Sequence, residues 1–92
     1  MNPKISEEIT VTLKRPVVDS ASKTEYTSLH LKEPVLFQAE DFYRNTTTMG
    51  AVGAMRELIA AVAGVPSGPL KFMALSDFKK CEAFLSVFFR AD

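Results

Sequence analysis

Residues 26–43, YTSLHLKEPVLFQAEDFY, contain the change of periodicity that decides the fold class. Up to Leu31, apolar and polar residues alternate, which is the pattern of a β-strand with one buried face. Pro34 suits the first turn of a helix, and beyond it apolar residues recur at spacings of three and four. The stretch therefore predicts a strand followed by a short helix, and hence an α+β fold.

A second strand is predicted before this stretch. Residues 9–13, ITVTL, alternate in the same way, and Pro16 is expected to end this strand or to place it at an edge. The polar residues 19–25 between the two strands lack the Asn-Gly or Asp-Gly of a tight turn. We therefore expect an antiparallel β-hairpin over residues 8–32 with a long, mobile connecting loop.

Further helices are predicted after the first one. Residues 45–48, NTTT, are expected to end the first helix, and the helical pattern that starts at Ala51 should end at Gly64 and Pro66. A single helical turn is expected near residues 70–73, and Ser76 is the expected N-cap of a last helix that runs to the C-terminus. Residues 1–92 should thus form a single domain, in which the hairpin precedes a three- to four-helix bundle over residues 34–90. The residues expected to be buried are Met55, Leu58, Ile59, Val62, Phe78, Leu85 and Phe88.

Composition disfavours nucleic acid and membranes as partners. The 92 residues carry eleven basic and eleven acidic side chains, which are spread evenly, whereas sequence-independent nucleic-acid binding depends on clustered Lys and Arg. The longest nearly uncharged stretch, residues 58–70, is interrupted by glycine and proline and is shorter than the roughly 20 residues of a spanning helix. A single cysteine, Cys81, and the absence of a leader peptide favour an intracellular protein.

No combination of residues suggests catalysis. His30 should face solvent without a second group for acid-base chemistry, and Cys81 lies on an apolar helix stripe as a small buried side chain. The carboxylates of residues 7–8 and of residues 40–41 are adjacent in sequence and point apart, so they are expected to be surface charges. One histidine and one cysteine cannot form a closed zinc site. We therefore expect a protein that is not an enzyme and has no metal or cofactor.

The last predicted helix has more apolar surface than one core stripe needs. Phe78 and Leu85 define the stripe, whereas Phe84 and Val87 fall outside it at 100° per residue, with Phe88 at its edge. We predict that Phe84, Val87 and Phe88 form a partner-binding face in which the first two face solvent. Packing of this surplus within the domain is the alternative. We also expect self-association, because a small chain gains from covering apolar surface.

The order of these segments resembles the small tail assembly chaperones of long-tailed, Mu-like bacteriophages. The resemblance extends over ITVTLKRPV at residues 9–17, LHLKEP at 29–34, LIA at 58–60 with GVP at 64–66, LSDF at 75–78, and AFL at 83–85 with FF at 88–89. No single segment is a diagnostic motif, and the specificity comes from their order and separation.

The resemblance implies a chaperone that binds the tail tape measure protein and keeps it soluble in the cytoplasm of an infected or lysogenic bacterial host. It also implies absence from the finished particle, later displacement by the tail tube protein, and a longer form made by ribosomal frameshifting. The alternative from another class is a small regulatory or adaptor domain of a phage or bacterial operon that uses the same aromatic face. A small enzyme based on His30 is the least favoured interpretation.

Overall fold

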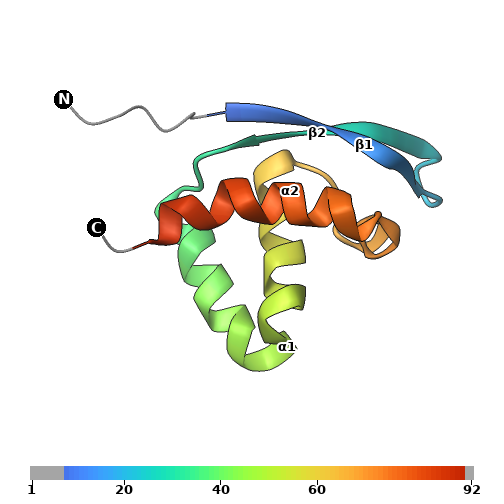
Figure 1. The fold of residues 1–92 in the computed structure, drawn as a ribbon. Coiled ribbons are helices and arrows are strands. Elements are labelled where there is room, and N and C mark those ends of the chain that lie inside the picture. Colours follow the sequence, from blue (N-terminus) through green and yellow to red (C-terminus); the bar gives the residue numbers. More distant parts are fainter. Residues whose placement is uncertain (1–7, 91–92) are drawn as a thin grey trace.

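The computed structural model describes residues 8–90 and shows a β-hairpin that lies across two α-helices (Figure 1). The predicted α+β class and N-terminal antiparallel hairpin are confirmed, whereas the three- to four-helix bundle is wrong. The elements are β1 (Glu8–Asp19), β2 (Thr24–Lys32), α1 (Leu36–Ala63), the 3₁₀ segment η1 (Gly68–Phe72), α2 (Leu75–Ser86) and the 3₁₀ segment η2 (Val87–Phe89).

The two strands pair in the register that the alternation predicts. Ile9 is opposite Leu31 and Val11 is opposite Leu29, so the apolar side chains share the inner face. The connection is shorter than expected, because β1 ends at Asp19 and β2 begins at Thr24. The Asp19 carboxylate organises this turn: it accepts hydrogen bonds from the Ala21 N–H at 3.2 Å and from the Ser22 hydroxyl at 2.8 Å.

Pro16 does not end the first strand, which continues to Asp19. It has the other role predicted for it, a position in an edge strand, because both strands of a two-stranded sheet are edges. Thr12 pairs with Ser28 and Val17 pairs with Tyr26, so residues 13–16 lie opposite Thr27 alone and form a bulge. A bulge is one of the few places in a sheet where proline is tolerated, because the ladder hydrogen bonds are already interrupted there. Regular pairing resumes at Val17 and continues to Asp19.

The first two predicted helices are two arms of α1, residues 36–49 and 51–63, which meet at a sharp break (Figure 1). Residues 45–48 do not end the first arm, because the hydroxyls of Thr46, Thr47 and Thr48 donate to backbone carbonyls three residues earlier, at 2.7, 2.8 and 3.3 Å. The break occurs at Gly50, whose φ of 80° and ψ of 170° are accessible essentially to glycine alone.

Of the other two predicted helix ends, the C-terminal end of α1 is confirmed and the N-cap of α2 is wrong. Gly64 ends α1 in the left-handed conformation, as predicted, and its N–H donates to the Ala60 carbonyl at 2.8 Å. Ser76 is not the N-cap of α2, because the helix begins one residue before it, with Ala74 at the cap position. The first turn of α2 instead contains Asp77, which is fully buried. Its carboxylate accepts a hydrogen bond at 3.2 Å from the backbone N–H of Arg15, in the bulge of β1.

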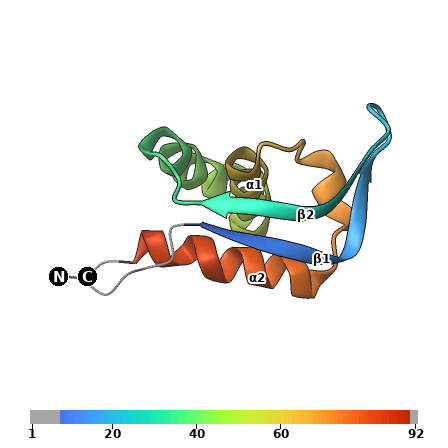
Figure 2. The ribbon, with the colours of Figure 1, turned by 90° about the horizontal axis from the view of Figure 1, so that it is seen from above.

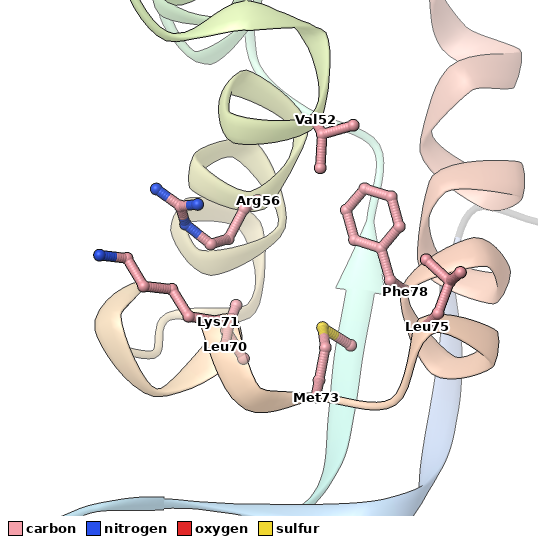
Figure 3. A pocket seen from close by; sticks show the side chains of 7 residues that line it. All are labelled: Val52, Arg56, Leu70, Lys71, Met73, Leu75 and Phe78. Atoms are coloured by element: carbon pink, nitrogen blue, oxygen red, sulfur yellow. The ribbon is translucent and has the colours of Figure 1, made fainter.

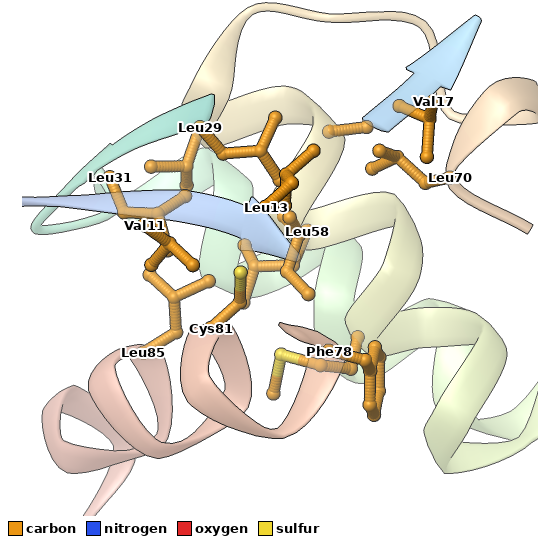
Figure 4. Close-up of a cluster of buried hydrophobic side chains, with 14 residues drawn as sticks. Val11, Leu13, Val17, Leu29, Leu31, Leu58, Leu70, Phe78, Cys81 and Leu85 are labelled. Atoms are coloured by element: carbon orange, nitrogen blue, oxygen red, sulfur yellow. The ribbon is translucent and has the colours of Figure 1, made fainter. Parts of the chain in front are cut away.

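The core lies between the hairpin and the helices. Viewed from above, β1 runs along α2, whereas β2 passes over α1, whose arms point away from the hairpin (Figure 2). Apolar side chains from the inner face of the hairpin meet those of α1, η1 and α2 (Figure 4). The predicted burial is confirmed for Met55, Leu58, Ile59, Val62, Phe78 and Leu85. It is wrong for Phe88, which is only half-buried because α2 has already given way to η2 at that position.

Candidate functional site: an aromatic groove

A groove with a volume of about 330 Å³ lies between the beginning of α1 and the end of the α2–η2 segment. We call it the aromatic groove, and its lining residues are Glu33, Pro34, Val35, Leu36, Ala39, Tyr43, Phe88 and Phe89. The start of α1 is held by Gln38, whose side-chain carbonyl accepts a hydrogen bond from the Val35 N–H at 3.0 Å. This contact satisfies a backbone donor at the helix N-terminus and so fixes the wall that carries Leu36.

Three aromatic rings form the supporting wall of the groove. The Phe89 ring centroid lies 4.9 Å from that of Phe42 and 5.5 Å from that of Tyr43, and the Phe42 and Tyr43 centroids are 5.7 Å apart. Such offset and edge-to-face pairs stabilise by about 0.5–1.5 kcal/mol each beyond their area burial. They fasten η2 to the first arm of α1 and hold the groove open.

The exposed side chains of the aromatic groove are large and apolar. Leu36 is 75% exposed, Tyr43 is 58% exposed and Val35 is 52% exposed. Leu36 and Tyr43 are two turns apart on the same face of α1, because seven residues span almost two helical turns. This ridge lies beside the Phe88 and Phe89 rings in the groove, and together they offer the kind of apolar surface that can hold the apolar stripe of a helix.

The three predicted partner-binding residues have different positions relative to the aromatic groove. Phe88 lines it. Phe84 and Val87 do not, and both are half-buried instead of facing solvent as expected. Phe84 packs against the core, and its ring lies edge-to-face with that of Phe88 at 5.4 Å between centroids. Phe84 thus supports Phe88 from behind, and the binding role of the three residues stays a prediction.

From the sequence, Leu36 and Tyr43 belong to the apolar repeat of the first helix. That helix is the second choice for the binding surface, after Phe84, Val87 and Phe88 of the last helix. One feature of the sequence indicates that part of this helix stays exposed. Phe37 and Phe42 make its apolar surface wider than a single stripe. Phe42 is the half-buried member that packs against the core, whereas Leu36, Phe37 and Tyr43 are exposed.

The residues considered for catalysis are placed as follows. His30 lies on the outer face of the hairpin, with its Nε2 2.7 Å from Glu8 Oε1 and its Nδ1 3.2 Å from the Thr10 hydroxyl. Cys81 is fully buried, and burial together with the nearby Asp77 carboxylate raises the pKa of its thiol to about 11. Glu40 and Asp41 are exposed, and Asp41 pairs with Arg44 at 2.7 Å. The predicted carboxylate pair at residues 7–8 lies partly outside the described residues.

Within residues 8–90, no three or more His, Cys, Asp or Glu side chains cluster in a way that could hold a metal ion. No helix in the same residues has the length and apolar character needed to cross a membrane.

Comparison with known proteins gives a family assignment. The model of a protein family described as phage tail assembly chaperone proteins, E, or 41 or 14, matches residues 10–90. The chain belongs to this family of phage tail assembly chaperones. No curated protein and no solved structure gave a significant match. The match covers every element described above except the first two residues of β1, and it includes the residues of the aromatic groove.

Membership of this family indicates which kind of surface to look for on the fold. A tail assembly chaperone acts on tail proteins, so the surface of interest is one that receives another polypeptide. The aromatic groove is the candidate for such a surface, because exposed apolar side chains surround it.

Proposed function

We propose that this tail assembly chaperone binds the tail tape measure protein through the aromatic groove and keeps it soluble during tail assembly. The protein acts without catalysis in the host cytoplasm and is absent from the finished particle. The observation that carries the proposal is a groove of about 330 Å³ in which the exposed side chains of Leu36 and Tyr43 lie beside Phe88 and Phe89.

The geometry supports reversible binding of a helix. A long, helical tape measure protein would expose apolar stripes until the tail tube encloses it, and each stripe presents side chains at spacings of three and four. Full burial of one Leu or Phe side chain contributes about 1.5–3 kcal/mol, so one groove gives modest affinity. Several copies along one long partner then cover it while leaving each contact weak enough to be displaced by tail tube subunits.

The test is co-expression with the tape measure protein encoded by the same phage or prophage. The double variant Leu36→Asp, Tyr43→Asp changes two exposed groove residues, and Leu36→Asp alone is tested beside it because the Tyr43 ring also packs against Phe42 and Phe89. Far-UV circular dichroism and thermal unfolding check that each variant is folded. We expect soluble tape measure protein with the wild-type chaperone and insoluble tape measure protein with the double variant. Val18→Asp is the matched control, because Val18 is also exposed, at 56%, and lies on the hairpin outside the groove.

Three results would speak against the proposal in different ways. Equal solubilisation by the double variant would place the binding surface elsewhere. A loss of solubilisation in Val18→Asp as well would show that any added charge disturbs the complex. Failure of the wild-type chaperone to co-purify with the tape measure protein would instead favour a regulatory or adaptor role with another partner.

A further inference from the structure

A second groove lies on another part of the molecule and differs in charge from the aromatic groove. It has a volume of about 220 Å³ and is formed by the second arm of α1, η1 and the start of α2. We call it the basic groove, and its lining residues are Val52, Arg56, Leu70, Lys71, Met73, Leu75 and Phe78. Figure 3 shows Arg56 and Lys71 on one side of it and Phe78 and Leu75 on the other.

The basic groove combines an apolar rim with incompletely paired cations. Val52 is 66% exposed and Leu75 is 69% exposed. Lys71 takes part in none of the ion pairs formed within residues 8–90. Arg56 has a single long contact, at 3.4 Å to Glu57, and its Nε is buried without a hydrogen-bond partner in the same part of the chain. A ligand that carries an apolar side chain and a carboxylate would complement both features.

The first arm of α1 presents this combination of groups. Leu36 and Glu40 are one turn apart on the same face, and both are exposed. Glu33, also exposed, lies just before the helix on the approach to Leu36. Neither Glu33 nor Glu40 takes part in an ion pair within the described residues. We call these three residues, Glu33, Leu36 and Glu40, the acidic face.

We propose that the basic groove of one copy receives the acidic face of a second copy. The Leu36 side chain enters between Val52, Leu75 and Phe78, and the carboxylates of Glu33 and Glu40 approach Lys71 and Arg56. The two surfaces are distinct regions of the same chain, so the contact is heterologous. However many copies have docked, the assembly still has one free basic groove and one free acidic face. Association therefore gives oligomers whose size increases with protein concentration instead of a single closed dimer.

This interface would regulate access to the aromatic groove. Leu36 belongs to both the acidic face and the aromatic groove, so a copy whose acidic face is docked cannot present a complete groove to a helix. Self-association and tape measure binding are therefore mutually exclusive on that copy. This consequence rests on the proposed function, whereas the interface between copies does not.

The interface is tested by charge reversal and sedimentation velocity on the purified chain at low salt. The wild type should have a weight-average mass that rises above 10.2 kDa with concentration and falls again when salt is added. The groove variant Arg56→Glu, Lys71→Glu and the face variant Glu33→Lys, Glu40→Lys should each lose about tenfold or more in association constant, since two attractive pairs become repulsive. The fourfold variant that combines them should associate again.

Controls separate the interface from general effects of charge. Lys14→Glu, Lys80→Glu reverses two exposed charges outside both surfaces and should associate like the wild type. Arg56 is partly buried, so its substitution can also affect folding. The single variants Lys71→Glu and Leu36→Asp avoid this, because both positions are exposed, and each should also weaken association. A strictly monomeric wild type, unchanged association in the groove variants, or no recovery in the fourfold variant would each overturn the proposed interface.

Discussion

Gly50 is the position at which one substitution should have the largest backbone effect, and we predict that Gly50→Ala destabilises the fold. The φ of 80° and ψ of 170° at this residue allow the two arms of α1 to reverse direction. An added Cβ would meet no atom within 4 Å, so the substitution causes no steric clash with the rest of the protein. The cost is the conformational strain of a non-glycine residue in this region, about 1–3 kcal/mol.

Two other glycines provide a graded comparison, because a Cβ at either would also meet nothing within 4 Å. Gly64 has a φ of 72° and a ψ of 34°, the left-handed helical region, where alanine costs about 1 kcal/mol. Gly68 has no positive φ, so Gly68→Ala should be within about 0.5 kcal/mol of the wild type or slightly more stable. The predicted order of stability is therefore Gly68→Ala, then Gly64→Ala, then Gly50→Ala.

Urea unfolding followed by circular dichroism measures this order directly, and thermal unfolding gives a second readout. In a domain of this size each kcal/mol of destabilisation lowers Tm by about 4–8 °C. A Gly50→Ala protein as stable as Gly68→Ala would refute the argument, because it would mean that the reversal at residue 50 does not depend on a glycine-only conformation.

Three further predictions concern buried side chains. Asp77→Ala should cost about 1–3 kcal/mol in urea unfolding, because it leaves the Arg15 N–H without its acceptor, and Asp77→Asn should cost less because the amide oxygen can replace the carboxylate oxygen. Burial raises the pKa of the Cys81 thiol from 9.0 to about 11, so the folded state holds its proton longer than the unfolded state. Stability should therefore fall as pH rises from 9.0 towards 11, and Cys81→Ala should remove this component of the pH dependence. Leu85→Ala, at a fully buried position, should cost about 2–5 kcal/mol, whereas Leu75→Ala, at a side chain that is 69% exposed, should cost less than about 0.5 kcal/mol.

The hairpin was predictable because strand periodicity is a local property of the chain. The inner positions Val11, Leu13, Leu29 and Leu31 are all buried, as alternation requires. The bulge was not predictable, because its hydrogen-bond partner is distant in sequence. The Arg15 N–H donates to the carboxylate of Asp77, 62 residues later. Proline rules alone left two roles open for Pro16, the end of the strand or a position in an edge strand, and could not show that the strand continues for three more residues.

The helices and the site were predictable only in part. The Thr46, Thr47 and Thr48 hydroxyls bond to their own helix, so residues that usually favour turns remain helical here. The aromatic content of the last predicted helix drew attention to Phe88, which lines the aromatic groove. The groove itself requires Leu36 and Phe88 to meet across two helices, and this depends on the direction that the chain takes after Gly50.

The bulge in β1 also bears on the sheet edges. A two-stranded sheet has an unpaired edge along each strand, and such edges can pair with other chains and cause aggregation. In β1 the exposed side chains of Lys14, Arg15 and Pro16 interrupt this edge with two charges and a residue that lacks an N–H. The Arg15 N–H is already engaged by Asp77, so it is not available to a neighbouring strand. If several copies of the chaperone gather on one partner, as proposed above, the Lys-Arg-Pro segment at residues 14–16 protects the β1 edge against strand addition between the copies.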